Sequence, residues 1–131
     1  MRQKCELNLR MAEALSQDIE NSDGWTTSIH CSYYAVFQYM KYLLAEKAET
    51  RISYDDQNAL GESSHQYILN EIKNRINNVN TARRVRERIL SLRQYRIAAD
   101  YRPKVFTQEE ALNCNMEANA VIKQLATLIS A

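Results

Sequence analysis

The chain has 131 residues, of which 45% are hydrophobic, and its formal net charge is +1. This length suits a single domain with a buried core, which we expect to span residues 1–131. Two glycines and one proline are too few for the repeated turns of a sheet protein, so we predict an all-α fold, an antiparallel up-and-down helical bundle of about five helices.

The first half of the chain predicts two helices, over residues 3–20 and 25–47. In the first, apolar residues recur every four positions and form one stripe. The stripe consists of Leu7, Met11, Leu15 and Ile19. The second helix has a regular stripe of large side chains, which predicts the central, most buried helix. Its stripe consists of Ile29, Tyr33, Val36, Met40 and Leu43.

The second half predicts three helices after a long loop. Residues 49–62 show no clear period and predict a loop, with or without a short helical turn. A third helix should begin near Ser63 or Ser64, and a fourth should cover residues 81–101, where Arg102-Pro103 ends it. Thr107 and Glu110 have the spacing of a capping box, which predicts the start of the last helix.

Basic residues are concentrated in one segment. Residues 73–104 carry a charge of +8, which leaves −7 for the rest of the chain. Such asymmetry is found at nucleic-acid interfaces. It is also found on solvated helix faces whose basic residues pair with acidic neighbours, and we favour this second explanation. If RNA or a nucleotide binds, the candidate residues are Arg84, Arg88, Arg93 and Tyr34.

The three cysteines and the absence of long apolar runs exclude several other classes of protein. Cys5, Cys31 and Cys114 are far apart and odd in number, so we expect neither a disulfide framework nor a metal site, and no cofactor. No run of about 18 apolar residues is present, so we expect no membrane segment. With no export signal in the sequence, we predict a cytoplasmic location.

Two groups of residues could carry chemistry. Arg96 falls on the apolar seam of its helix, where it needs a partner, and Asp100 lies four residues later on the same face. We favour a structural ion pair there over a catalytic arginine. His65 opens the third helix, where the helix dipole favours the neutral form that a general base requires, although a simple polar cap is the more frequent role.

Four stretches of the sequence resemble the HEPN domain. They are SYYAVFQYMKYLLAEK over residues 32–47, SSH over 63–65, LRQYRIAADY over 92–101 and FTQEEALNCNMEANAVIKQL over 106–125. The resemblance implies an antiparallel helical bundle, a homodimer, and a nucleotidyltransferase-type antitoxin as partner. It carries over to Tyr34, His65, Arg96, Asp100 and Tyr101.

The resemblance also implies metal-independent RNA cleavage in active relatives, which use an arginine followed four to six residues later by a histidine. Here the arginine nearest before His65 is Arg51, fourteen residues away. We therefore favour a HEPN-like module of a toxin–antitoxin or nucleotidyltransferase-linked system that binds a partner protein, a nucleotide or RNA without this catalysis. One alternative is a ribonuclease toxin using Arg96 and His65, with Asp100 and Tyr101 beside them. Another is a purely structural assembly bundle.

Overall fold

The computed structural model describes residues 1–58 and 64–129 of the chain. Within these ranges it contains six α-helices and one π-helical turn and no strand, which confirms the all-α bundle. The elements are α1 (Arg2–Gln17), α2 (Asp23–Tyr42), the π-helical turn η1 (Leu43–Lys47), α3 (Tyr54–Asn58), α4 (Ser64–Asn74), α5 (Val79–Tyr101) and α6 (Gln108–Leu128).

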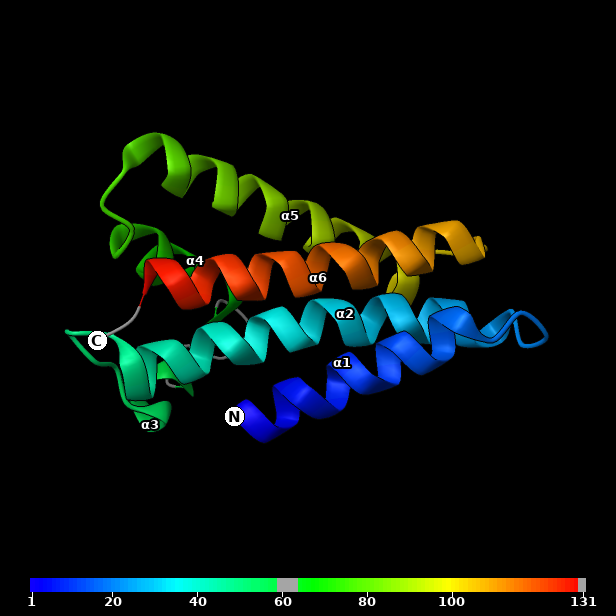
Figure 1. Cartoon of the computed structure of the whole chain (residues 1–131), viewed down its shortest axis with the longest axis horizontal. Helices are drawn as coiled ribbons and strands as arrows, with labels where there is room; N and C mark the ends of the chain where they lie inside the picture. Colours follow the sequence, from blue (N-terminus) through cyan, green and yellow to red (C-terminus); the bar gives the residue numbers. More distant parts are fainter. Residues whose placement is uncertain (59–63, 130–131) are drawn as a thin grey trace.

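Four long helices form the bundle, and they alternate in direction (Figure 1). α1 and α5 run one way, and α2 and α6 run the other way. α2 contacts α1, α5 and α6, and the short α4 lies against both α2 and α5. The helix that the sequence analysis did not count is α3, which falls inside the predicted loop over residues 49–62. The last part of that predicted loop, residues 59–62, and Ser63, one of the two predicted starts of the third helix, lie outside the described residues.

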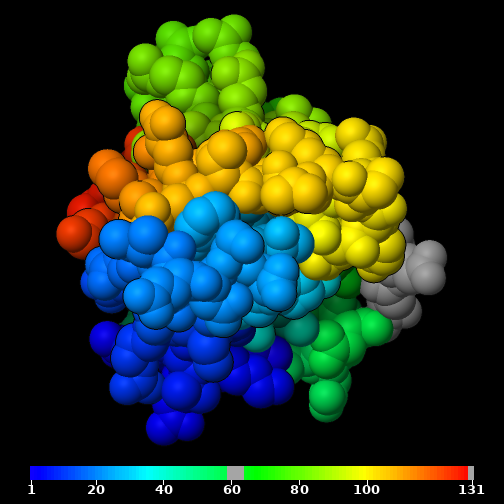
Figure 2. All heavy atoms as spheres, turned by 90° about the vertical axis from the view of Figure 1, so that its right-hand side faces the viewer, coloured from blue at the N-terminus to red at the C-terminus, as the bar shows by residue number. Residues whose placement is uncertain are grey.

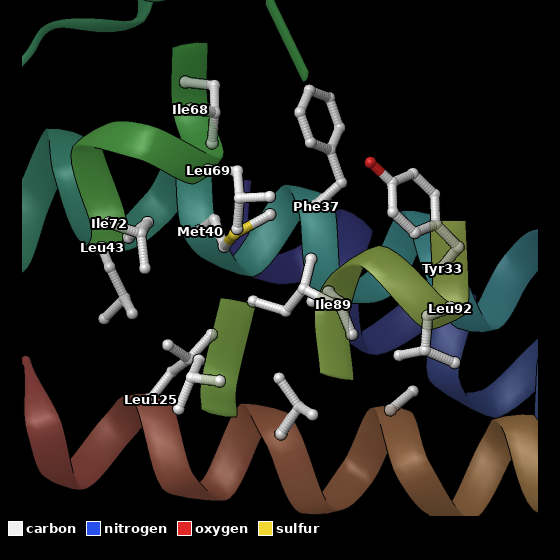
Figure 3. Close-up of a cluster of buried hydrophobic side chains, with 14 of the residues drawn as sticks. Tyr33, Phe37, Met40, Leu43, Ile68, Leu69, Ile72, Ile89, Leu92 and Leu125 are labelled. Carbon is white, nitrogen blue, oxygen red and sulfur yellow. The ribbon is translucent and has the colours of Figure 1, made fainter. Parts of the chain in front are cut away.

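The core is built around α2, as predicted. Ile29, Val36 and Met40 are each at most 1% exposed. Large side chains from α4, α5 and α6 converge on this face (Figure 3). Because α2 is covered on three sides, its buried stripe is wider than the single seam of a surface helix. The side chains labelled in the figure include Ile68, Leu69, Ile72, Ile89, Leu92 and Leu125.

The predicted stripe of α1 is not the face that the helix buries. Leu7 and Met11 are 58% and 52% exposed, whereas Cys5, Ala12 and Ser16 are buried. Small side chains on this face allow α1 to approach α2 closely. The Ser28 hydroxyl donates to the Ala12 carbonyl at 2.6 Å. A Cβ atom at Gly24 would lie only 3.1 Å from Leu15 Cδ2.

The ends of the later helices follow the sequence signals. The Thr107 hydroxyl accepts from the Glu110 amide, and the Glu110 carboxylate accepts from the Thr107 amide, so the predicted capping box starts α6. Asn78 caps α5 by accepting from the Thr81 amide. The extended backbone of Arg102, before Pro103, ends α5 where it was predicted to end. Among the described helices, none is long and apolar enough to cross a membrane.

Candidate functional site

Arg96 lies at the centre of an aromatic cluster formed by α2 and α5. Its side chain is only 8% exposed. The guanidinium carbon is 5.4 Å from the ring centroids of Tyr33 and Tyr34 and 5.9 Å from that of Tyr101. Aromatic faces stabilise such a cation, and Arg is the cation that stacks best. The expected position of Arg96 on the apolar seam is therefore confirmed.

Asp100 is the carboxylate partner of Arg96, and it is shared with a histidine. Its Oδ2 lies 3.7 Å from Arg96 Nη1, while its two oxygens lie 2.8 and 2.9 Å from His30 Nδ1. The closer partner is therefore His30 on α2, whose ring also lies 4.6 Å from that of Tyr34. Arg96 Nε is buried and finds no hydrogen-bond acceptor among the described residues. Within the described residues, Asp100 is thus the only ion-pair partner of the buried guanidinium.

His65, in the first turn of α4, completes the cluster from a third helix. Its ring stacks on Phe37 with centroids 4.0 Å apart, and its Nδ1 lies 2.7 Å from the Tyr33 hydroxyl. Burial, together with the charges of Arg93 and Arg96, lowers the pKa of His65 to about 4. Burial also raises the pKa of Tyr33 to about 12. Both groups are therefore neutral near pH 7, and for His65 the causes are burial and neighbouring positive charges.

The structure brings six of the eight predicted site residues into one region. Arg96 and His65 are on different helices, yet both lie within about 6 Å of the Tyr33 and Tyr34 rings. Asp100 and Tyr101 continue the region along α5, with Tyr101 75% exposed. The Arg93 guanidinium adds a second positive charge, and its Nε is buried without an acceptor in the described part of the chain. Both arginines therefore lie close enough to His65 for their charges to act on it, and Arg96 is also paired with Asp100.

The other two predicted binding residues lie elsewhere. Arg88 forms an ion pair with Glu117 and donates to the Gln124 side chain, so it joins α5 to α6. Arg84 is exposed and lies one helical turn before Arg88, on the side of α5 that faces α6. The preferred explanation of the basic segment, pairing with acidic neighbours, is correct for Arg88. Arg84 forms no ion pair within residues 1–58 and 64–129.

Two residues of this cluster, Tyr33 and His30, were not predicted as site residues. Tyr33 was predicted only as part of the buried stripe of the second helix. Arg86 shares the helix face of Arg93, since the two are seven residues apart, and this spacing was available in the sequence. The contacts of Tyr33 and His30 join residues 32 and 70 positions apart in the chain. Only the folded arrangement shows them.

The geometry favours binding of an anion. No group of three metal-ligating side chains is present in the part of the chain that the structure describes. The two guanidiniums supply donors in a planar fork that matches phosphate or carboxylate. Figure 2 shows the C-terminal part of α5, in yellow, at the surface beside the start of α2, in light blue, at the end of the bundle where Asp100 and His30 meet.

Comparison with known families identifies the fold. The HEPN domain family model matches residues 5–128, which is nearly the whole chain. The chain belongs to the HEPN domain family. A search of curated proteins and a search of solved structures each found no match. In this HEPN domain His65 of α4 and Arg96 of α5 both contact Tyr33, the first residue of the tyrosine pair of α2.

Proposed function

We propose that this HEPN domain is an RNA-binding module that holds phosphate groups at Arg93 and Arg96, beside His65 and Tyr34. The observation that carries the proposal is the buried Arg96 guanidinium, whose only ion-pair partner among the described residues is 3.7 Å away and is shared with His30. A second guanidinium from Arg93 raises the positive charge there. A bound phosphate would supply the missing charge, and Tyr34, which is half-buried, offers a ring edge to a base.

A strand of RNA fits this surface better than a single phosphate. Arg86, Arg93 and Arg96 follow the same side of α5, and the helix rises about 15 Å from Arg86 to Arg96 at 1.5 Å per residue. Neither Arg86 nor Arg93 forms an ion pair within the described residues. A row of this length can contact successive phosphates, whereas a lone nucleotide would reach only one end of it.

The test is fluorescence anisotropy of a labelled single-stranded RNA at several salt concentrations. For single strands the logarithm of affinity falls with that of salt by about 0.7 per phosphate contact. Arg93→Gln and Arg86→Gln should each weaken binding and reduce this slope by about one contact. Arg84→Gln, the same change on the opposite side of α5, is the matched control and should leave the slope nearly unchanged. Salt-independent binding, or an unchanged affinity of Arg93→Gln, would overturn the proposal.

A second candidate function is metal-independent RNA cleavage by the same cluster. The observation in its favour is the neutral His65, which meets the Arg96 site through Tyr33 and Tyr34. A neutral imidazole can take a proton from a hydroxyl, and an arginine can stabilise charge that develops on phosphate. Asp100 would hold Arg96, and Tyr101 would border the substrate.

The cleavage test uses total RNA in the presence of EDTA. The wild type is compared with a His65→Ala, Arg96→Ala double variant whose fold is checked by circular dichroism. Cleavage by the wild type that is lost in the variant supports catalysis. Absence of cleavage by the wild type refutes this second candidate and leaves RNA binding as the proposed function.

We further propose that the domain forms a homodimer and contacts a nucleotidyltransferase-type antitoxin, and that it acts in the cytoplasm. Leu7 and Met11 on α1 are exposed apolar side chains that a protein contact could cover. Sedimentation velocity of the wild type and of Leu7→Glu tests the homodimer. A monomeric wild type would refute it. Assembly without any salt-dependent RNA binding would instead favour the structural bundle.

A further inference from the structure

A pocket of different chemistry adjoins the proposed phosphate site. Its volume is about 510 Å³, and it lies between the start of α2 and the end of α5. Its polar groups are three hydroxyls, one imidazole and one carboxylate, with no lysine or arginine among the lining residues. The lining residues are Thr26, Thr27, His30, Ala99, Asp100 and Tyr101.

The His30–Asp100 pair gives this pocket a defined hydrogen-bond polarity. Because Asp100 accepts from His30 Nδ1, the nitrogen of the ring that remains for a ligand is Nε2. The ring is held in place by its contact with Tyr34 at 4.6 Å. The His30 side chain is 42% exposed and lines the pocket. The Asp100 oxygens add further acceptor positions beside it.

These acceptors select for a ligand group that donates hydrogen bonds and carries no negative charge. A phosphate in the pocket would meet the Asp100 carboxylate and be repelled by it. A sugar hydroxyl would instead donate to Asp100 or pair with His30 Nε2, while the threonine hydroxyls can bond a neighbouring oxygen. The pocket is therefore suited to a sugar.

The position of the pocket agrees with this assignment. Asp100 contacts Arg96 on one side and His30 on the other, at 3.7 and 2.8 Å. The sugar attached to a phosphate at Arg93 and Arg96 would thus lie beside His30. Resting on the proposed RNA binding, we infer that the pocket receives a ribose of the bound strand and that His30 and Asp100 recognise its 2′-hydroxyl. The pair would then make the domain specific for RNA over DNA.

The test compares RNA, DNA and 2′-fluoro strands of one sequence with the wild-type protein and with His30→Phe. The fluorine cannot donate a hydrogen bond, so it isolates the donor role of the 2′-hydroxyl. The wild type should bind RNA about tenfold more tightly than either other strand, the difference expected from one or two hydrogen bonds. His30→Phe keeps a ring beside Tyr34 and should abolish the preference for RNA, so that the variant binds RNA and DNA with equal affinity.

The outcomes separate this inference from the proposed function. Equal affinity of the wild type for RNA, DNA and 2′-fluoro RNA would overturn the recognition of the 2′-hydroxyl and leave phosphate binding intact. Loss of affinity in His30→Phe that is equal for RNA and DNA would also overturn it. Binding of none of the strands by the wild type would overturn the proposed function itself. The wild-type comparison requires no variant to fold.

Discussion

Replacing His65 with phenylalanine should make the stability of the protein less sensitive to acid. The substitution keeps a ring stacked on Phe37 but removes an imidazole whose pKa is lowered to about 4 by burial and by the neighbouring arginines. In the unfolded chain the same histidine titrates near its ordinary pKa of 6.5. The native and unfolded states therefore bind different numbers of protons between these two values.

The sign and size of the effect follow from linkage. Below about pH 6.5 the unfolded chain takes up a proton at His65 that the native protein does not, so the free energy of unfolding falls as the pH falls toward 4. Near pH 5 the ceiling is about 2 kcal/mol, at about 1.4 kcal/mol per pH unit. Because His65 is partly open to solvent, which screens the neighbouring charges, we expect about 1 kcal/mol.

The measurement is urea unfolding of the wild type and of His65→Phe by circular dichroism, near pH 7.5 and near pH 5. Loss of the Tyr33 hydrogen bond should cost the variant about 1 kcal/mol at both pH values, and this constant cancels in the comparison. On acidification the wild type should lose about 1 kcal/mol more than the variant, which corresponds to about 4 °C in Tm. Equal losses in the two proteins would refute a neutral, proton-resisting His65.

Two further predictions concern the fold. Leu125→Ala, in the buried core face of α6, should lower the free energy of unfolding by about 2–5 kcal/mol. The same change at the exposed Leu7 should lower it by less than about 0.5 kcal/mol. Similar losses for the two variants in urea unfolding would contradict the buried face of α1 described above. Thr107→Ala removes the capping box, which should lower the free energy of unfolding by about 1 kcal/mol and Tm by about 4 °C. Thr127→Ala, in the last turn of α6, is the control and should change Tm little. Equal melting temperatures of the two variants would contradict a stabilising cap.

Local signals predicted the later helices well, because their ends depend on nearby residues. The capping box of α6 is complete within four positions, and the end of α5 is set by the residue pair Arg102-Pro103. The faces of α1 could not be predicted in the same way. Hydrophobic periodicity weights large side chains, whereas a close helix contact requires small ones such as Ala12 and Ser16. Leu7 and Met11 would keep the helices apart.

In the candidate site, too, features within one helix were predictable and contacts between helices were not. The position of Arg96 on its apolar seam and the spacing to Asp100 were predictable, since both depend on one helix. The contacts between Tyr33 and His65 and between His30 and Asp100 join different helices. Periodicity indicates which face of a helix is buried, but it does not indicate which residue of another helix lies opposite. The pairing of His30 with Asp100 therefore emerged only from the folded arrangement.

Tyr33 belongs both to the hydrophobic core and to the candidate site. Its ring is 1% exposed in the core, and its hydroxyl lies 2.7 Å from His65 Nδ1. Any repacking around this ring would move the hydroxyl and change the partner of His65. Thermal melting can also serve as a ligand screen, because saturation at a hundred times Kd stabilises a protein by about 2.7 kcal/mol. By the same coupling, core variants selected only for heat resistance would alter ligand affinity without touching an exposed residue.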